Sequence, residues 1–209
     1  MPKLNEESEE LQMLLEVAEI VANARMSSRQ RGGDLSPSDK GNLSGRATEN
    51  VIRDHLLRKC FKLSKTRVQI SPLSMEIDLL QLKLGADPMK MTYLPEEVVT
   101  VFEIKNNAVT DQATKTKTNF DRLKSIVRNA RFAFVVLSER ISYSYRVTPK
   151  ELQYPVYELI SRRRSAGHWM ESRSEIIAEY RRITRTGERA MWETGEWNKL
   201  INDLSSKSG

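Results

Sequence analysis

The chain has 209 residues and a single cysteine, Cys60, so it is long enough for one domain with a sizeable core and excludes an internal disulfide bond. Its formal net charge is +6, and residues 1–20 hold six glutamates against one lysine, so the positive charge belongs to the rest of the chain; a basic body predicts a polyanionic partner, or else a surface that only keeps the protein soluble. The acidic start is unlike a secretory signal and the longest apolar run, 132–137, is too short to cross a bilayer, which predicts a cytoplasmic protein without a membrane partner.

The first 61 residues predict two helices separated by a loop. Residues 6–25 carry apolar side chains at the spacing of an amphipathic helix, with glutamates at its positive N-terminal end. Residues 26–45 are rich in Ser, Gly, Pro and Asp and predict a flexible loop. A second helix is expected over 45–61, and its buried side would consist of Val51, Ile52, Leu56, Cys60 and Phe61.

The middle of the chain predicts a sheet. Strands are expected over 67–71, 75–84 and 97–105. Glycine and proline residues between the last two predict a loop or an insertion over 85–96. A helix with a basic outer side is expected over 111–129, and a strand over 131–139 has the fully apolar centre that is typical of burial on both faces.

The C-terminal third predicts helices, over 150–164, 171–185 and 189–205. Together these elements predict an α/β fold in which helices flank a central mixed β-sheet. The chain would then divide into an N-terminal amphipathic helix, a loop, an α/β core and a helical region packed on the core, with bounds 1–25, 26–45, 46–145 and 146–209.

The residue types available limit the chemistry. His55, His168 and Cys60 are too few for a histidine-rich zinc site or a Cys/His finger. The chain also lacks the sequence patterns of a serine-nucleophile elbow, a phosphate-binding P-loop and a dinucleotide-binding turn. Carboxylates and lysine remain as candidate catalytic groups.

The strand over 97–105 contains a charged pair in an apolar setting. Glu103 follows a run that is apolar apart from Thr100, and burying an unpaired carboxylate is costly. Side chains alternate along a strand, so Lys105 is expected on the same face as Glu103. If Asp78 met them from the neighbouring strand, the three groups would form a site for a divalent cation such as Mg²⁺ and a phosphate. The alternative is an ion pair at the strand end.

Asp78 is the preferred partner acid, because it lies in an apolar run where a solvated carboxylate is not expected. Glu76 is expected on the same face and is a rival ligand. Asp87 is another rival, but it precedes Pro88 in a sequence typical of a turn.

Glu49 is the fourth candidate. At 100° per residue it projects from the end of the buried stripe of the second helix, which would bring it towards the strands. The alternative is a pair within the helix, with Arg46 or Arg53, worth a few tenths of a kcal/mol.

The order of Glu49, Asp78 and Glu103-Ile104-Lys105, followed by a basic helix and an apolar strand, resembles the PD-(D/E)xK nuclease superfamily over about residues 45–140. Restriction endonucleases and archaeal Holliday-junction resolvases share this fold. The resemblance implies that Asp78, Glu103 and the Ile104 carbonyl hold Mg²⁺, for which Mn²⁺ would substitute. It also implies that Lys105 positions the attacking water and that Glu49 assists a second metal ion or a water. The residue before Asp78 departs from the family pattern, because it is isoleucine rather than proline.

Basic residues outside this set are candidates for contact with nucleic acid, since arginine and lysine bind phosphate. These candidates are Arg46, Lys115, Lys117, Arg162, Arg163 and Arg164. Tryptophans interleaved with the C-terminal arginines are expected in a small core rather than stacked on bases.

These observations lead to the hypothesis of a metal-dependent endonuclease that hydrolyses phosphodiester bonds of DNA, of the restriction, host-defence or phage type. One alternative is a nuclease-like module that binds nucleic acid or a protein partner without cleaving. Another is a structural domain with ion-paired acids, in which Glu103 contacts Lys105 and no metal binds. By analogy with the family a homodimer is expected, with helix 6–25 as its candidate interface.

Overall fold

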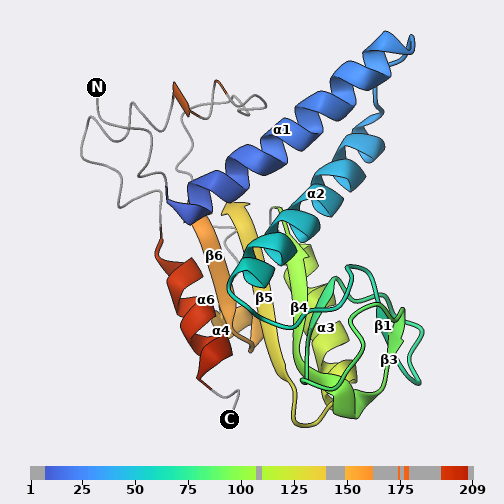
Figure 1. Cartoon of the computed structure of the whole chain (residues 1–209), viewed down its shortest axis with the longest axis vertical. Coiled ribbons are helices and arrows are strands. Elements are labelled where there is room, and N and C mark those ends of the chain that lie inside the picture. The colour runs from blue at the N-terminus through green and yellow to red at the C-terminus, as the bar shows by residue number, and fades with distance from the viewer. Residues whose placement is uncertain are drawn as a thin grey trace.

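The computed structural model describes residues 8–106, 110–139, 149–161, 174, 177–178 and 194–206. These residues form an α/β fold in which helices cover both faces of a mixed β-sheet, as expected from the order of elements (Figure 1). The elements are α1 (Glu9–Gln30), α2 (Pro37–Arg58), β1 (Gln69–Ile70), β2 (Leu79–Leu82), β3 (Thr92–Tyr93), the short 3₁₀ helix η2 (Pro95–Glu97), β4 (Val98–Lys105), α3 (Thr110–Lys124), β5 (Arg131–Glu139), α4 (Pro149–Leu152), β6 (Val156–Ser161) and α6 (Glu196–Ser205).

The main sheet has the strand order β2-β4-β5-β6. The edge strand β2 is antiparallel to β4, whereas β4, β5 and β6 are parallel to one another. The carboxyl ends of these three strands therefore share one edge of the sheet, which is where parallel sheets commonly bind ligands. At this edge Lys105 lies in register with Val136, and Val136 with Glu158. The strands β1 and β3 form a separate two-stranded parallel sheet.

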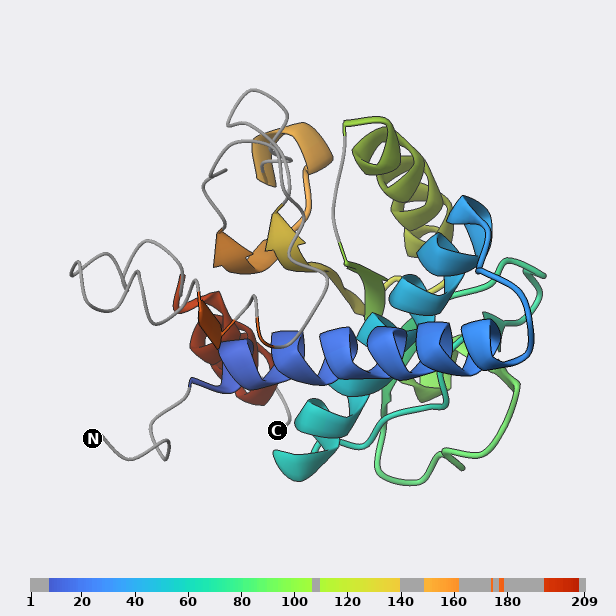
Figure 2. The same ribbon diagram turned by 90° about the horizontal axis from the view of Figure 1, so that it is seen from above.

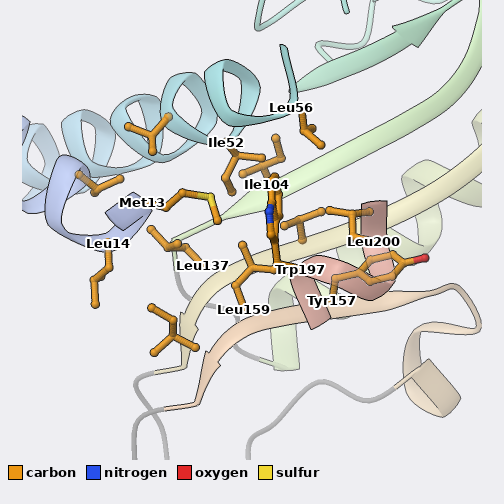
Figure 3. Packing of buried hydrophobic residues seen from close by; sticks show 14 of the residues in the cluster. Met13, Leu14, Ile52, Leu56, Ile104, Leu137, Tyr157, Leu159, Trp197 and Leu200 are labelled. Carbon is orange, nitrogen blue, oxygen red and sulfur yellow. The ribbon is translucent and has the colours of Figure 1, made fainter. Parts of the chain in front are cut away.

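Apolar side chains on the two faces of the sheet form two core clusters. On one face α1, α2 and α6 cover Phe102 and Ile104 of β4, with Trp197 and Leu200 of α6 in the same cluster (Figure 3). On the other face α3 covers Val101 of β4. In the view of Figure 2, α3 and α4 lie on the opposite side of the sheet from α1. Because strand side chains alternate, the odd-numbered residues at the end of β4 project to the α3 side.

The loop predicted over 26–45 is wrong. Helix α1 continues to Gln30, α2 begins at Pro37, and only 31–36 connect them. Ser36 is the N-cap of α2: its Oγ accepts a hydrogen bond from the Asp39 backbone N–H at 3.1 Å and donates one to Asp39 Oδ2 at 2.6 Å. Proline is well tolerated at the first position of a helix, so the Ser-Pro sequence begins α2 instead of preventing it.

The helix predicted over 150–164 is also wrong. Only four residues form α4, and Val156–Ser161 form β6, the fourth strand of the sheet. Tyr157 and Leu159 pack on the α1 side, whereas Val156 packs on the α3 side, so this segment is buried on both faces. A continuous apolar run does not distinguish such a strand from a buried helix.

Other boundaries differ from the prediction. The strand expected over 75–84 is limited to β2, because Ile77 pairs with Val68 outside the main sheet. Strand β5 has the predicted bounds. Of the C-terminal helices, α6 covers the end of the range predicted as 189–205, and most of 171–185 lies outside the described residues. The helices of the described part are too short or too polar to cross a membrane.

A polar cluster around the buried side chain of His55 joins α1 to α2. His55 of α2 is 1% exposed; its Nδ1 lies 3.1 Å from Glu9 Oε1, and its Nε2 lies 3.3 Å from Glu16 Oε1. Lys59 Nζ lies 2.7 Å from Glu9 Oε2. Burial alone would raise the pKa of Glu9, but the hydrogen bonds from Lys59 and His55 outweigh burial and lower it.

We expect Glu9→Gln to destabilise the protein at neutral pH by about 0.5–1 kcal/mol, the usual worth of a partly exposed ion pair. A carboxylate whose pKa is lowered by folding stabilises the native state above its unfolded pKa, and this contribution is lost as pH falls through the folded pKa. The difference from wild type should therefore disappear in acid. Urea unfolding between pH 3 and 7 measures it, with the exposed Glu96→Gln as control. A difference that persisted unchanged at pH 3 would contradict the assignment.

Candidate active site

Asp78 lies immediately before β2 and is fixed against the end of β4. Its Oδ2 accepts a hydrogen bond of 2.7 Å from the Ile104 backbone N–H and lies 3.2 Å from Lys105 Nζ. Its backbone carbonyl accepts a hydrogen bond of 3.0 Å from the Arg67 N–H. Because β2 begins only at Leu79, the Asp78 carboxylate takes the place of a backbone acceptor on the Ile104 N–H. The residue is 8% exposed, so its position is set by the sheet rather than by solvent.

Glu103 and Lys105 lie on one face of β4, as their spacing predicts. Lys105 Nζ lies 2.7 Å from Glu103 Oε1. One ammonium group therefore contacts both carboxylates, Asp78 from the β2 side and Glu103 from its own strand. This is also the contact that the structural alternative predicts, so metal binding and activity distinguish the two readings.

The electrostatics of these three groups favour a cation between the acids. Burial raises the pKa of Glu103, and the nearby negative charge of Asp78 raises it further, while Lys105 opposes both effects. Burial would lower the pKa of Lys105, but Asp78 and Glu103 outweigh it and raise that pKa. Lys105 is thus held in its charged form, and the site stabilises positive charge at the point where the two carboxylates converge.

Glu49 forms a bidentate pair with Arg67 and lies close enough to Asp78, Glu103 and Lys105 for their charges to interact with its own. The Glu49 side chain on α2 is buried, and both of its oxygens accept hydrogen bonds from Arg67: Nε to Oε2 at 2.8 Å and Nη2 to Oε1 at 2.9 Å. Burial raises the pKa of Glu49, and the bidentate pair with Arg67 opposes that rise. In the part of the chain that the structure describes, neither Arg46 nor Arg53 forms an ion pair with Glu49; Arg53 Nε donates to the Ser64 carbonyl instead.

Arg67 was not anticipated from the sequence. It has a left-handed backbone conformation, with φ of 60°, which non-glycine residues seldom adopt. Its pairing with Glu49 spans 18 residues, and no local pattern marks it. The two rivals of Asp78 lie elsewhere: Glu76 is exposed, with Oε1 3.6 Å from Arg67 Nη1, and Asp87 Oδ1 accepts from the Met89 N–H within a turn.

The donor set fits Mg²⁺ better than a metal that needs many protein ligands. Asp78 Oδ2 and Glu103 Oε1 both lie within 3.2 Å of one nitrogen atom, Lys105 Nζ, so both oxygens can reach a single cation. No group of three or more His, Cys, Asp or Glu side chains with metal-binding geometry occurs among the residues that the structure describes. Mg²⁺ usually keeps several waters and takes only one or two carboxylates from the protein, which suits this pair together with the Ile104 carbonyl.

The predicted nucleic-acid contacts that the structure describes lie on two helices, α2 and α3. Arg46 on α2 and Lys115 on α3 are exposed. Lys117 is partly buried and pairs with Asp121 one turn along α3, with Nζ and Oδ2 2.7 Å apart. The arginines at 162–164 lie outside the described residues.

No protein-family model matches the chain, and no curated protein matches it significantly. Among solved structures it is similar to NucC of P. aeruginosa ATCC27853 in the cAAA-bound form, with 14% identity, 92% of this chain and 98% of that chain covered, and a TM-score of 0.44. It is also similar to NucC of E. coli MS115-1. The cAAA-bound form of that protein has 13% identity, coverage of 91% and 96%, and a TM-score of 0.41; the apo form has 14% identity, coverage of 88% and 98%, and a TM-score of 0.39.

Proposed function

We propose that the protein is a metal-dependent endonuclease that hydrolyses phosphodiester bonds of DNA. The observation that carries the proposal is the convergence of Asp78 and Glu103 on one ammonium group at the carboxyl end of β4. A buried and a partly buried carboxylate that share a single cation are costly to hold together, and a divalent ion with a phosphate would offset that cost. The net positive charge of the chain supports a polyanionic substrate.

The residues of the site would have different roles in the reaction. Asp78, Glu103 and the Ile104 carbonyl would hold Mg²⁺, which supplies charge neutralisation at the phosphate and a bound water of lowered pKa. The hydrogen bond from the Ile104 N–H fixes Asp78, so this ligand needs no reorganisation when the ion binds. Lys105, whose pKa is raised, would donate from its ammonium group to the phosphate oxygen or the attacking water.

The test is cleavage of supercoiled and linear DNA with Mg²⁺ or Mn²⁺, for wild type, Glu103→Ala and the exposed-site control Glu96→Ala. We expect metal-dependent cleavage by wild type and control, no cleavage in EDTA, and a loss of at least about 10³-fold in Glu103→Ala, since a metal ligand is removed. Calorimetric titration with Mn²⁺ on the same samples adds a readout independent of substrate choice. Cleavage that survived in Glu103→Ala would refute the assignment of the site.

The second candidate function is a module that binds DNA or a protein without cleaving. The 2.7 Å contact between Glu103 and Lys105 favours it, because the two charges neutralise each other without a metal ion. This candidate predicts no Mn²⁺ binding that depends on Glu103 and no cleavage of either DNA form. Binding of DNA with both of those results would replace the endonuclease proposal.

A further inference from the structure

Arg67 lies beside the candidate active site and retains hydrogen-bonding capacity. Its backbone N–H donates to the carbonyl of Asp78, so the residue is tied to the chain that carries the metal-binding acid. Its side chain is 32% exposed, whereas the Glu49 side chain that it contacts is 5% exposed. The guanidinium group thus extends from a buried anchor towards solvent at the edge of the sheet that holds Asp78.

The contact with Glu49 uses only part of the guanidinium group. Arginine has five N–H donors, and the described hydrogen bonds of the side chain, from Nε and Nη2 to Glu49, occupy two of them. The exposed Glu76 lies 3.6 Å from Nη1, which is too far for a hydrogen bond. Nη1 and the second N–H of Nη2 make no described hydrogen bond, and this pair has the geometry that binds phosphate oxygens in a bidentate manner; a phosphate there would compete with the Glu76 carboxylate beside Nη1.

The charges around Arg67 determine which class of ligand it can bind. Hydrogen bonding to Glu49 raises the pKa of Arg67, with smaller contributions from Glu76 and Asp78, so the group is permanently cationic. Glu49 fixes the orientation of the guanidinium plane before any ligand arrives, which reduces the entropy lost on binding. A phosphodiester would meet the same repulsion from Asp78 and Glu103 as a carboxylate, so its binding at Arg67 depends on the cation that the proposed function places between those two acids. A nucleic acid differs from a single carboxylate in offering one phosphate to Arg67 and a neighbouring one to that cation.

We propose that Arg67 is a phosphate-binding residue that contacts the nucleic-acid backbone next to the cleavage site, and that Glu49 acts as its anchor rather than as a metal ligand. This inference rests on the proposed function for the identity of the ligand. It replaces the expectation that Glu49 assists a second metal ion. Arg67 thereby positions the strand relative to Asp78 and Glu103 without touching the metal.

The test is DNA binding without cleavage, measured by fluorescence anisotropy with a labelled 30-base-pair duplex in Ca²⁺ at several salt concentrations. Each phosphate contact contributes about 0.9 to the slope of log K against log salt concentration. We expect Arg67→Gln to weaken binding about tenfold at low salt and to reduce the slope by about one. Arg67→Lys should keep most of the slope, because it keeps the charge. Arg128→Gln is the matched control: Arg128 is exposed and precedes β5, at the opposite end of the strands, and its slope should equal that of wild type.

Two further variants separate binding from folding. Arg67→Gln leaves a buried carboxylate without its partner, so the double variant Glu49→Gln/Arg67→Gln, which removes both charges, should fold and show the same reduced slope. Glu49→Gln alone should leave Mn²⁺ affinity unchanged, and a fall of tenfold or more would restore Glu49 as a metal ligand and overturn the anchor role.

The outcomes distinguish this inference from the proposed function. An unchanged slope in the folded double variant overturns the role of Arg67 even if the protein cleaves DNA. A reduced slope without any cleavage supports Arg67 as a phosphate contact and refutes the endonuclease. Failure of the wild type to bind the duplex at any salt concentration overturns both.

Discussion

The Lys105→Met variant is expected to bind Mn²⁺ at least as tightly as the wild type and to cleave DNA about 10²–10³ times more slowly. The loss of rate is the usual consequence of removing one donor that stabilises charge in the transition state. The gain in affinity has a separate cause. The ammonium group lies 2.7 Å from Glu103 Oε1 and 3.2 Å from Asp78 Oδ2, so it competes with a metal ion for these two oxygens.

Opposite changes in metal affinity and rate would separate Lys105 from the metal ligands, since loss of a ligand lowers both. Calorimetric Mn²⁺ titration and single-turnover cleavage measure the two quantities. Lys83→Met is the matched control, because Lys83 is exposed and follows the far end of β2. If Lys105→Met lost Mn²⁺ affinity, the lysine would be organising the carboxylates rather than competing for them, and its catalytic role would need another basis.

The three groups of the site can be predicted from the sequence because Glu103 and Lys105 lie within the regular strand β4 and Asp78 immediately precedes β2. Alternation along β4 places Glu103 and Lys105 on one face whatever the rest of the fold, and an antiparallel neighbour is enough to bring Asp78 to them. The apolar centre of 131–139 likewise predicts β5 with its observed bounds, because a strand buried on both faces cannot alternate with polar residues. These features depend on the order of residues within one strand, so they can be predicted from the sequence of that strand.

Features that depend on long-range contacts were missed. The Glu49–Arg67 pair joins a helix to a connecting segment through a left-handed residue, and neither the pairing nor the backbone conformation leaves a periodic signal. The sequence does not predict β6 as a strand, because an apolar run lacks a distinguishing period and only its pairing with β5 makes it a strand. The start of α2, in contrast, has a local signal in the sequence, because Ser36, Pro37 and Asp39 form a helix-capping sequence. The nearby glycines favour a loop, and for that reason the prediction of the helix start is wrong.

Asp78→Ala and Glu103→Gln are expected to change stability by different amounts in metal-free buffer, although both remove a candidate metal ligand. Asp78→Ala should cost about 2–3 kcal/mol, because the buried Ile104 N–H loses its charged acceptor. Glu103→Gln should change stability by less than about 1 kcal/mol at neutral pH, since it removes a carboxylate whose charged form burial and Asp78 disfavour.

The difference in stability between wild type and Glu103→Gln should change with pH in a defined direction. A carboxyl group whose pKa is raised on folding stabilises the native state below its unfolded pKa, and that contribution is lost as pH rises through the folded pKa. The wild type therefore loses stability, relative to Glu103→Gln, as pH rises above the ordinary glutamate pKa of about 4.3. Urea unfolding in EDTA measures this trend, and the exposed Glu96→Gln should show none. If Glu103→Gln instead lost stability relative to wild type as pH rose, the Lys105 ion pair would outweigh burial. The charge of Lys105 would then be enough to stabilise the carboxylates, and the stability data would give no support for a metal ion at this site.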